Sequence, residues 1–203
     1  MNTPQWEQVY ANLRRDMGLR EKRIRMFSFS PRSRILELGC GDGLNLEIMH
    51  KLGYKNVFGL DYSFDLLKRI KGIPVLLADA CKTGFTANSF DVVFIDSFLH
   101  HLESPGECLQ EIKRILKPKG LLCFMEPRNS FIRTVLDWLT FLPVLQFLPF
   151  FKNRSISLKE EYGVYRKWLK THKEFMVLLK NSGFKVLFLR NGLIGFFVKS
   201  TNG

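Results

Sequence analysis

Short apolar runs alternate along the chain with segments in which apolar residues recur at every third or fourth position. A short apolar run between turn residues is typical of a buried strand, and the wider spacing is typical of an amphipathic helix. The predicted strands cover residues 34–38, 56–60, 73–78, 90–96 and 121–125, and the predicted helices cover residues 44–52, 64–71 and 105–116. This alternation predicts a parallel, doubly wound α/β sheet.

Several element boundaries carry their own signals. Ser63 is suited to cap the helix over residues 64–71. Residues 104–107, Ser-Pro-Gly-Glu, combine a capping box with proline at the first helical position, so a helix is expected to begin at Pro105. Residues 117–120, Lys-Pro-Lys-Gly, are expected to form the turn before the strand at 121–125.

The end of the chain breaks the alternation. Residues 171–174, Thr-His-Lys-Glu, form a second capping box, and its helix is expected to close at Gly183. Strands over residues 184–189 and 193–199 then follow, joined by a tight Asn-Gly turn. Strands joined by so short a turn are antiparallel. The expected fold is therefore a mostly parallel, seven-stranded sheet with an antiparallel last strand.

Two segments fall outside this scheme. Residues 1–30 are expected to form an N-terminal helical arm, in which Trp6, Val9, Tyr10 and Leu13 recur at helical spacing. Residues 127–170 form an insertion between the fifth strand and the last helix, and a connection of that length usually has a function. We expect both segments to belong to one domain spanning residues 1–203.

Composition narrows the class of protein. With 203 residues, of which 46% are hydrophobic, the chain suits one domain with a substantial core. A net charge of +12 favours anionic partners such as nucleic acid or a lipid headgroup surface, or it is a solvated basic surface. The four cysteines show no C-x-x-C spacing, which favours buried thiols. Residues 1–18 lack the apolar core of a signal peptide, so a cytoplasmic location is expected.

A glycine-rich turn is the strongest chemical signal. Gly39, Gly41 and Gly43 alternate between the first predicted strand and its helix, and Asp61 ends the next strand twenty positions after Gly41. Such a turn lets a ligand lie against bare backbone near a helix N-terminus, and the acid can accept both hydroxyls of a ribose. The pattern predicts a nucleoside-bearing cofactor. A dinucleotide is one alternative, although that motif requires glycine where Leu44 stands.

Four motifs together decide between the cofactors. They lie at residues 35–43, 78–80, 99–102 and 115–120. At these residues the chain resembles the class I S-adenosylmethionine-dependent methyltransferases, especially the small-molecule group. The resemblance covers residues 32–126 by motif and 171–199 by topology. It implies a Rossmann-like methyltransferase fold, S-adenosylmethionine as cofactor and S-adenosylhomocysteine as product.

The resemblance also implies roles for individual residues at the amino-acid and ribose end of the cofactor. The backbone of Gly39, Cys40 and Gly41 would pass beneath the amino-acid part and the ribose, and the Cys40 side chain is expected to be structural. Glu37 would face the ammonium group, directly or through water. Asp61 would hold the ribose hydroxyls.

The remaining cofactor contacts implied by the resemblance follow later strands. Tyr62 would cover one face of the adenine, Asp79 would accept from the adenine amino group, and the Ala80 amide would meet a ring nitrogen. Asp96 and Ser97 would lie beside the methionyl chain, near the sulfonium. A surface or capping role is the alternative for each of the side chains.

His100 and His101 follow the fourth predicted strand, at the rim where such sheets bind ligands. One of them is a candidate catalytic base or substrate-orienting residue, and the alternative is that the pair makes hydrogen bonds within its own loop. The sequence contains no cluster with metal-ligand spacing, so we expect methyl transfer to need no metal.

The insertion bears on the methyl acceptor. Residues 138–151 contain fourteen residues and no charge, too few to cross a bilayer, and Pro143 and Pro149 interrupt any helix. Residues 152–173 carry a net charge of +5. The apolar stretch is a lid over a hydrophobic substrate, a peripheral contact of residues 131–173 with an anionic membrane, or a dimer interface or core segment.

These observations rank the acceptors. A small-molecule or lipid-like acceptor comes first, nucleic acid second and protein third, because the sequence shows no base-methylating motif after the fourth strand. The alternative outside catalysis is a scaffold that binds S-adenosylmethionine without turnover. The accepting atom and the oligomeric state do not follow from the sequence.

Overall fold

The computed structural model describes residue 14, residues 17–192 and residues 195–202. The strands are β1 (Ile35–Leu38), β2 (Val57–Asp61), β3 (Val75–Leu77), β4 (Phe90–Asp96), β5 (Leu116–Pro127), β6 (Phe184–Asn191) and β7 (Gly195–Asn202). The helices are α2 (Met17–Arg25), α3 (Leu44–Lys51), α4 (Phe64–Leu67), α5 (Pro105–Ile115), α6 (Phe131–Thr140) and α7 (Pro149–Asn181), with the short 3₁₀ helices η1 (Leu99–His101) and η2 (Pro143–Leu145). Trp6, Val9, Tyr10 and Leu13 lie outside the described residues.

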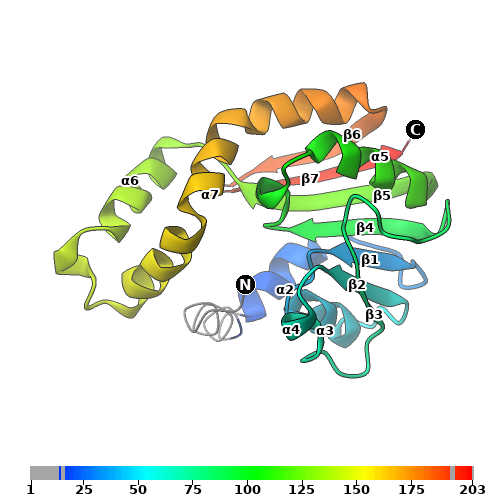
Figure 1. Ribbon diagram of the computed structural model, residues 1–203, viewed down its shortest axis with the longest axis horizontal. Coiled ribbons are helices and arrows are strands. Elements are labelled where there is room, and N and C mark those ends of the chain that lie inside the picture. The colour runs from blue at the N-terminus through cyan, green and yellow to red at the C-terminus, as the bar shows by residue number, and fades with distance from the viewer. Residues whose placement is uncertain (1–13, 15–16, 193–194, 203) are drawn as a thin grey trace.

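The strands form one seven-stranded sheet in the order β3-β2-β1-β4-β5-β7-β6 (Figure 1). Strands β1 to β5 pair in parallel, and β7 pairs antiparallel with both β5 and β6. The predicted fold class is therefore confirmed, although β7 is inserted between β5 and β6 and does not form the edge. The strand order reverses between β1 and β4, where sheets of this kind bind ligands beyond the strands' carboxyl ends.

Two hydrophobic cores cover the two faces of the sheet. On one face, Leu36 and Leu38 of β1 pack with residues of α5 and of the C-terminal half of α7. On the other face, Ile35 packs with residues of α2 and α3. This alternation along β1 follows from the opposite directions of successive side chains in a strand. It also places Glu37 on the α3 face.

Three predicted boundaries differ from the structure. Helix α4 ends at Leu67, because the amides of Arg69 and Ile70 bond to carbonyls only three residues back and tighten the chain before Gly72. Residues 117–120 lie inside β5 and have no pairing partner in its register with β4, so the predicted turn is a bulge in the strand, with Lys119 at φ 63°.

The third difference concerns the last helix. Helix α7 runs unbroken through residues 171–174, where a new helix was predicted to begin. The Thr171 hydroxyl donates to the Lys167 carbonyl, 3.1 Å away and one turn earlier, and does not cap a helix start. One helix therefore belongs to both the insertion and the sheet.

An arm projects from the body of the protein. It consists of α6, η2 and the N-terminal half of α7, and α7 bends near its middle before it runs back along the sheet (Figure 1). In the described part of the chain, no helix combines the length and the apolar character that spanning a bilayer requires. Within the same residues all four cysteines are free thiols, three of them buried, as expected.

Candidate functional site

A cavity of about 190 Å³ opens at the carboxyl ends of β1 and β2. It is lined by Gly39, Leu60, Asp61, Tyr62, Ala78, Asp79, Ala80 and Phe98. Five of these residues, all but Leu60, Ala78 and Phe98, were predicted from the sequence to contact the cofactor. The structure therefore brings the residues that were predicted to hold the ribose and the adenine together around one cavity.

Gly39 shapes the floor of this cavity. Its φ is +69°, and a Cβ placed there would lie 2.4 Å from the Phe98 ring. A larger residue would therefore be strained and would displace Phe98. The close approach of the ring to the glycine backbone explains why this turn position lacks a side chain, and it identifies Phe98 as a site residue that the motif did not reveal.

Asp61 ties the glycine turn to the end of β2. Its Oδ2 accepts from the Gly41 amide and its Oδ1 from the Ser63 amide, each at 2.8 Å. A carboxylate oxygen has a second lone pair, so both oxygens can still accept a hydroxyl each. Asp61 faces the cavity with the chemistry that the vicinal hydroxyls of a ribose require.

The remaining cavity residues differ in exposure. Asp79 Oδ1 accepts from the Cys81 amide at 2.7 Å, so this side chain also has the capping role considered as its alternative. Tyr62 is 84% exposed at the cavity mouth, and Ala80 is buried within it. A planar ligand entering this mouth would lie beside the Tyr62 ring.

A second polar group lies on the α3 face, at the ends of β1 and β4. Asn45 donates to Glu37 Oε1 at 2.7 Å and to Asp96 Oδ2 at 3.2 Å. Arg20 of α2 forms an ion pair with Asp96 and donates to Asn45 Oδ1. Next to this group, Ser97 Oγ lies 3.2 Å from Asp96 Oδ1. Arg20 and Asn45 were not among the predicted residues.

Glu37 carries the test of whether this site fits S-adenosylmethionine. Its side chain is buried, and its Oε2 has no hydrogen-bond partner among the described residues. Burial raises the pKa of Glu37 well above its ordinary value, although the bond from Asn45 opposes the rise. A buried carboxyl oxygen without a partner is costly, and a cationic ligand group removes that cost. An ammonium group satisfies this requirement.

Two further residues near the glycine turn, Cys40 and Arg14, make structural contacts. Burial raises the pKa of the Cys40 thiol, so the thiol stays protonated and unreactive. Its side chain packs in the core of the α3 face, as expected. Arg14 bonds to Asp42 and Glu47 at the start of α3. That contact joins Arg14 to the glycine turn and to the first turn of α3.

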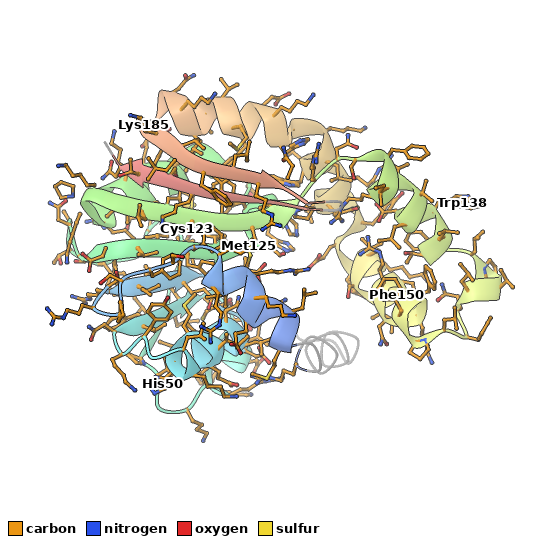
Figure 2. All side chains as sticks on the ribbon, turned by 180° about the vertical axis from the view of Figure 1, so that it is seen from behind. His50, Cys123, Met125, Trp138, Phe150 and Lys185 are labelled. Atoms are coloured by element: carbon orange, nitrogen blue, oxygen red, sulfur yellow. The ribbon has the colours of Figure 1, made fainter. Side chains whose placement is uncertain are left out.

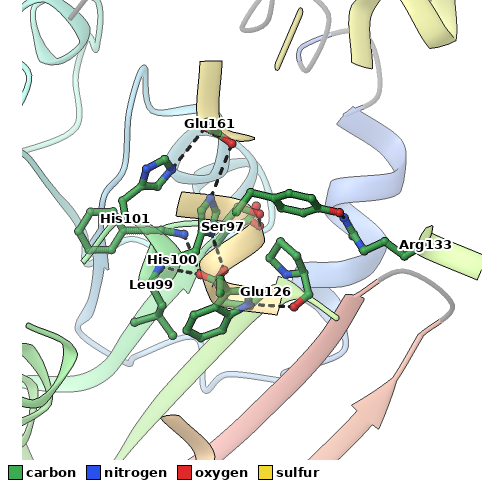
Figure 3. Close-up of polar contacts among 12 residues, drawn as sticks. Ser97, Leu99, His100, His101, Glu126, Arg133 and Glu161 are labelled. Carbon is green, nitrogen blue, oxygen red and sulfur yellow. Dashed lines mark hydrogen bonds and ion pairs between the residues drawn. The ribbon is translucent and has the colours of Figure 1, made fainter. Parts of the chain in front are cut away.

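The two histidines differ in their surroundings (Figure 3). His100 is buried, and its Nδ1 lies 2.8 Å from Oε2 of the buried Glu126. His101 is partly exposed, and its Nε2 lies 3.3 Å from Glu161 Oε1. Each imidazole contacts a carboxylate outside its own loop, because Glu126 lies in β5 and Glu161 lies on α7. The alternative expectation had been hydrogen bonds within the loop.

Burial favours the neutral form of His100, but Glu126 and Glu161 outweigh it and raise the pKa of His100 to about 9. The pKa of Glu161 falls to about 2, because the two imidazoles outweigh its burial. An imidazolium has no lone pair with which to accept a proton. The raised pKa disfavours His100 as a general base at neutral pH, and a catalytic role for either histidine stays a prediction.

Sequence reasoning missed Glu126 and Glu161 for different reasons. Glu126 lies near the end of a strand at the same rim as Asp96, so a search for acids at strand ends could have found it. Glu161 lies sixty positions after His101, within a charged helical stretch. Its approach to the histidines depends on how α7 docks, which no local pattern indicates.

Comparisons with known proteins agree with this geometry. Residues 36–124 match a family model described as a methyltransferase domain. A malonyl-[acyl-carrier protein] O-methyltransferase of Legionella pneumophila is 31% identical over 123 residues, which are 56% of this chain and 43% of that protein. A demethylmenaquinone methyltransferase of Renibacterium salmoninarum is 33% identical over 139 residues, which are 65% of this chain and 56% of that protein.

The chain spans about half the length of these curated relatives. Other matching relatives are named tRNA U34 carboxymethyltransferases. Among solved structures, a SAM-dependent methyltransferase from Aquifex aeolicus gives a TM-score of 0.64 over 90% of this chain and 89% of that chain, at 20% identity. At that identity, the likeness shows a common fold.

Proposed function

Because this chain carries a class I S-adenosylmethionine-dependent methyltransferase domain, we propose that it transfers a methyl group from S-adenosylmethionine to a small, lipid-like acceptor at a membrane surface. The observation that carries the acceptor class is the arm, whose large apolar side chains face outward while Arg133, Asp137 and Arg154 make polar contacts inside it. The relatives named for malonyl-[acyl-carrier protein] and demethylmenaquinone support a small-molecule class.

The residues that line the cavity fit one half of the cofactor, and the polar group around Glu37 and Asp96 fits the other half. Asp61, Tyr62 and Asp79 would hold its ribose and adenine, and Glu37 its ammonium group. Arg20 would hold its carboxylate, because it is the guanidinium beside Glu37 and Asp96. When bound, S-adenosylmethionine supplies a methyl group on a cationic sulfur, which departs as a neutral thioether.

The protein's contribution to transfer is alignment. An in-line displacement with a neutral leaving group gains most from holding the two reactants in line and from excluding water. The Asp61 bonds to the glycine turn and the Arg20–Asp96 contact fix that end of the site before any ligand arrives. A general base is required only for an acceptor whose proton has a high pKa.

The outside of the arm is apolar. Figure 2 shows Trp138 and Phe150 on the part of the arm that lies away from the sheet. The large exposed apolar side chains of the arm include Phe131, Ile132, Val135, Trp138, Phe141, Val144, Phe147, Leu148 and Phe150. Phe131 is 83% exposed and Phe147 is 75% exposed. Apolar side chains grouped in this way mark a contact with a membrane, a partner or a ligand.

The inside of the arm is polar. Arg133 of α6 is buried and donates to the Tyr165 hydroxyl of α7 at 2.9 Å. Asp137 of α6 accepts from Tyr165 and forms an ion pair with Arg154. Helices packed in water bury their apolar faces and expose their charges. In the arm, large apolar side chains are exposed and charged side chains are in contact inside, which fits an arm that contacts an apolar medium.

Exposed basic residues follow the apolar surface along α7. Lys152, Lys159, Arg166, Lys167 and Lys170 are exposed along α7. Basic residues beside an apolar surface are attracted to anionic lipid headgroups. An open hollow of about 390 Å³, lined by Phe141, Lys159 and Tyr162, lies on the same arm and offers apolar rings beside one cation.

The experiment follows the methyl group. The protein is incubated with methyl-labelled S-adenosylmethionine and either membrane extract or total RNA, and the product is partitioned between organic and aqueous phases. We expect label in the organic phase. A Trp138→Ser, Phe147→Ser double variant should lose at least about tenfold in transfer and in vesicle binding, because each buried large side chain contributes roughly 1.5–3 kcal/mol.

Leu187→Ser is the matched control, since Leu187 is 54% exposed but lies on β6. It should leave both readouts unchanged, and neither change should affect binding of S-adenosylhomocysteine. Label in RNA would replace the lipid-like acceptor with the alternative that the tRNA-modifying relatives suggest. No label in any fraction, despite cofactor binding, would support the scaffold.

A second prediction concerns Arg20. An Arg20→Met variant should bind S-adenosylhomocysteine about tenfold or more weakly, because a charge-assisted hydrogen bond contributes roughly 1.5–3 kcal/mol. Binding of 5′-methylthioadenosine, which lacks the amino-acid part, should be unchanged. Calorimetric titration of both ligands gives the comparison.

Arg25→Met is the control on the same helix, since Arg25 pairs only locally with Glu21 and is exposed. If the affinities for both ligands fell equally in Arg20→Met, Arg20 would hold the fold and not the carboxylate.

A further inference from the structure

Three potential ligand side chains meet where α7 crosses the rim of the sheet. His100 and His101 come from η1, and Glu161 comes from α7 (Figure 3). One ligand atom from each lies within 4.8 Å of the other two. Figure 3 shows both imidazole rings directed at the Glu161 carboxylate. The cluster lies outside the residues that line the cavity at the ends of β1 and β2.

The spacing of these atoms suits a small cation. His101 Nε2 lies 3.3 Å from Glu161 Oε1, and His100 Nε2 lies 3.7 Å from Glu161 Oε2. With metal–ligand bonds of about 2.0–2.2 Å, two ligand atoms of a tetrahedral site lie roughly 3.3–3.6 Å apart. These two separations, each to a different oxygen of Glu161, are close to that range. The ligand atoms of all three residues lie within 4.8 Å of one another, so side-chain movements would bring them to one ion.

Glu126 provides the support that a metal-binding histidine requires. Its Oε2 lies 2.8 Å from His100 Nδ1, and its Oε1 accepts from the amides of Phe98 and Leu99. A carboxylate at Nδ1 holds the Nδ1 proton, orients the ring and leaves Nε2 as the electron-pair donor. This carboxylate–histidine pair is buried, with side-chain exposures of 0% and 3%.

The Nε2 atom of His100 is the second, independent observation. It is buried and has no hydrogen-bond partner among the described residues. Its nearest charged neighbour is Glu161, at a separation too long for a hydrogen bond. A buried nitrogen directed at a carboxylate that it does not reach leaves room for an atom between them.

We propose that His100, His101 and Glu161 bind a divalent transition-metal ion, Zn²⁺ in the first instance, with Glu126 as the outer carboxylate of His100. Two imidazole nitrogens and one carboxylate form a ligand set that selects Zn²⁺ and its neighbours over Mg²⁺ or Ca²⁺. On binding, the Nε2 lone pairs and a carboxylate oxygen coordinate the ion. Any proton held at these atoms passes to solvent, and the fourth position is left to water or a ligand.

The ion would join two parts of the molecule. η1 lies at the rim beyond β4, and Glu161 lies on α7 near the base of the arm. A metal bridge between them would fix the arm against the sheet. The inference does not rest on methyl transfer, because metal binding is measured without cofactor or acceptor. The expectation that methyl transfer needs no metal stays a prediction, because the proposed ion joins two parts of the fold.

The experiment titrates chelator-treated full-length protein with zinc chloride in a calorimeter, with cobalt chloride as an optical probe. We expect one site, and cobalt absorption typical of nitrogen and oxygen ligands in tetrahedral geometry. Glu161→Ala and His101→Ala should each weaken binding by more than about 100-fold, exceeding the effect usual for an outer-shell partner. His50→Ala is the control, because His50 is exposed on α3.

Circular dichroism of each variant establishes that it remains folded. Glu161 and His101 are less buried than His100, so their replacement leaves the core intact. The proposal is overturned if the wild-type protein binds no zinc, or if both variants bind it as tightly as wild type. Thiolate-to-cobalt absorption would also overturn it, since that would assign the ion to the cysteines.

Discussion

An Asp61→Ala variant is expected to bind S-adenosylhomocysteine more than about 100-fold more weakly than the wild-type protein. Asp61 would lose its contacts with the ribose hydroxyls and also its bonds to the Gly41 and Ser63 amides, which hold the glycine turn at the end of β2. Each hydrogen bond to a charged group contributes roughly 1.5–3 kcal/mol, and each 1.4 kcal/mol is about a factor of ten in affinity. Calorimetric titration measures the loss.

Two controls separate the causes of that loss. Asp65→Ala removes a nearby exposed carboxylate that pairs with Lys68, and should leave affinity unchanged. Asp61→Asn keeps one oxygen as acceptor, so it should bind with intermediate affinity. 5′-Methylthioadenosine should lose affinity together with S-adenosylhomocysteine, because both carry the ribose. An Asp61→Ala variant that bound either ligand normally would contradict the assignment of the site.

Replacing Glu126 by alanine is expected to lower the free energy of unfolding by about 3–5 kcal/mol. The Glu126 side chain is fully buried and is contacted by the amides of Phe98 and Leu99 and by His100. Its removal leaves the buried Leu99 amide, the partly buried Phe98 amide and the buried His100 ring without their acceptor, and loss of one partner from a buried ion pair typically costs this much. Urea denaturation followed by circular dichroism measures the change.

Glu103→Ala, at an exposed position just after η1, is the control and should change the unfolding free energy by less than about 0.5 kcal/mol. Glu126→Gln keeps the volume and one acceptor oxygen but loses the charge, so its cost should lie between those of the other two. An equally small cost for Glu126→Ala and Glu103→Ala would show that the buried network contributes little. Glu126→Ala should also change the shape of the cavity, since Glu126 accepts from the Phe98 amide and the Phe98 ring lies against Gly39.

The parts of the fold that followed from the sequence have short-range determinants. The strand, turn and helix around Gly39 need only an apolar run, glycine at left-handed positions and a following helical pattern, all within about a dozen residues. The antiparallel final pair followed from its short connection. Asp61 could be placed because the end of β2 and the glycine turn belong to one βαβ unit.

The missed contacts depend on how distant segments pack. Arg20 and Asp96 are 76 positions apart, and their pairing requires α2 to lie across the ends of β1 and β4. Glu161 meets the histidines only because α7 crosses η1. Charged residues on helices are usually solvated, so no pattern in the sequence separated these two from their neighbours.

The boundary of α7 was missed for a reason of another kind. The motif at 171–174 has the residue types of a capping box, but the Thr171 hydroxyl can satisfy its hydrogen bond by donating to a carbonyl one turn earlier. Sequence type alone does not distinguish the two. The preceding residues continue the helix, because the Tyr165 and Trp168 side chains are buried against the core that covers the α5 face of the sheet.

The bend near the middle of α7 divides this helix into an outer half, which belongs to the arm, and an inner half, which runs along the sheet (Figure 1). The segment of the outer half from Pro149 to Glu161 is about 20 Å long at the usual rise per residue of an α-helix. Gly163, a weak point in any helix interior, follows Glu161 by two positions. The contacts of Glu161 with the two histidines therefore influence the angle at which the outer half of α7 leaves the sheet. A small rotation at the bend would produce a larger displacement at the far end of the arm, where Phe147 lies between η2 and α7.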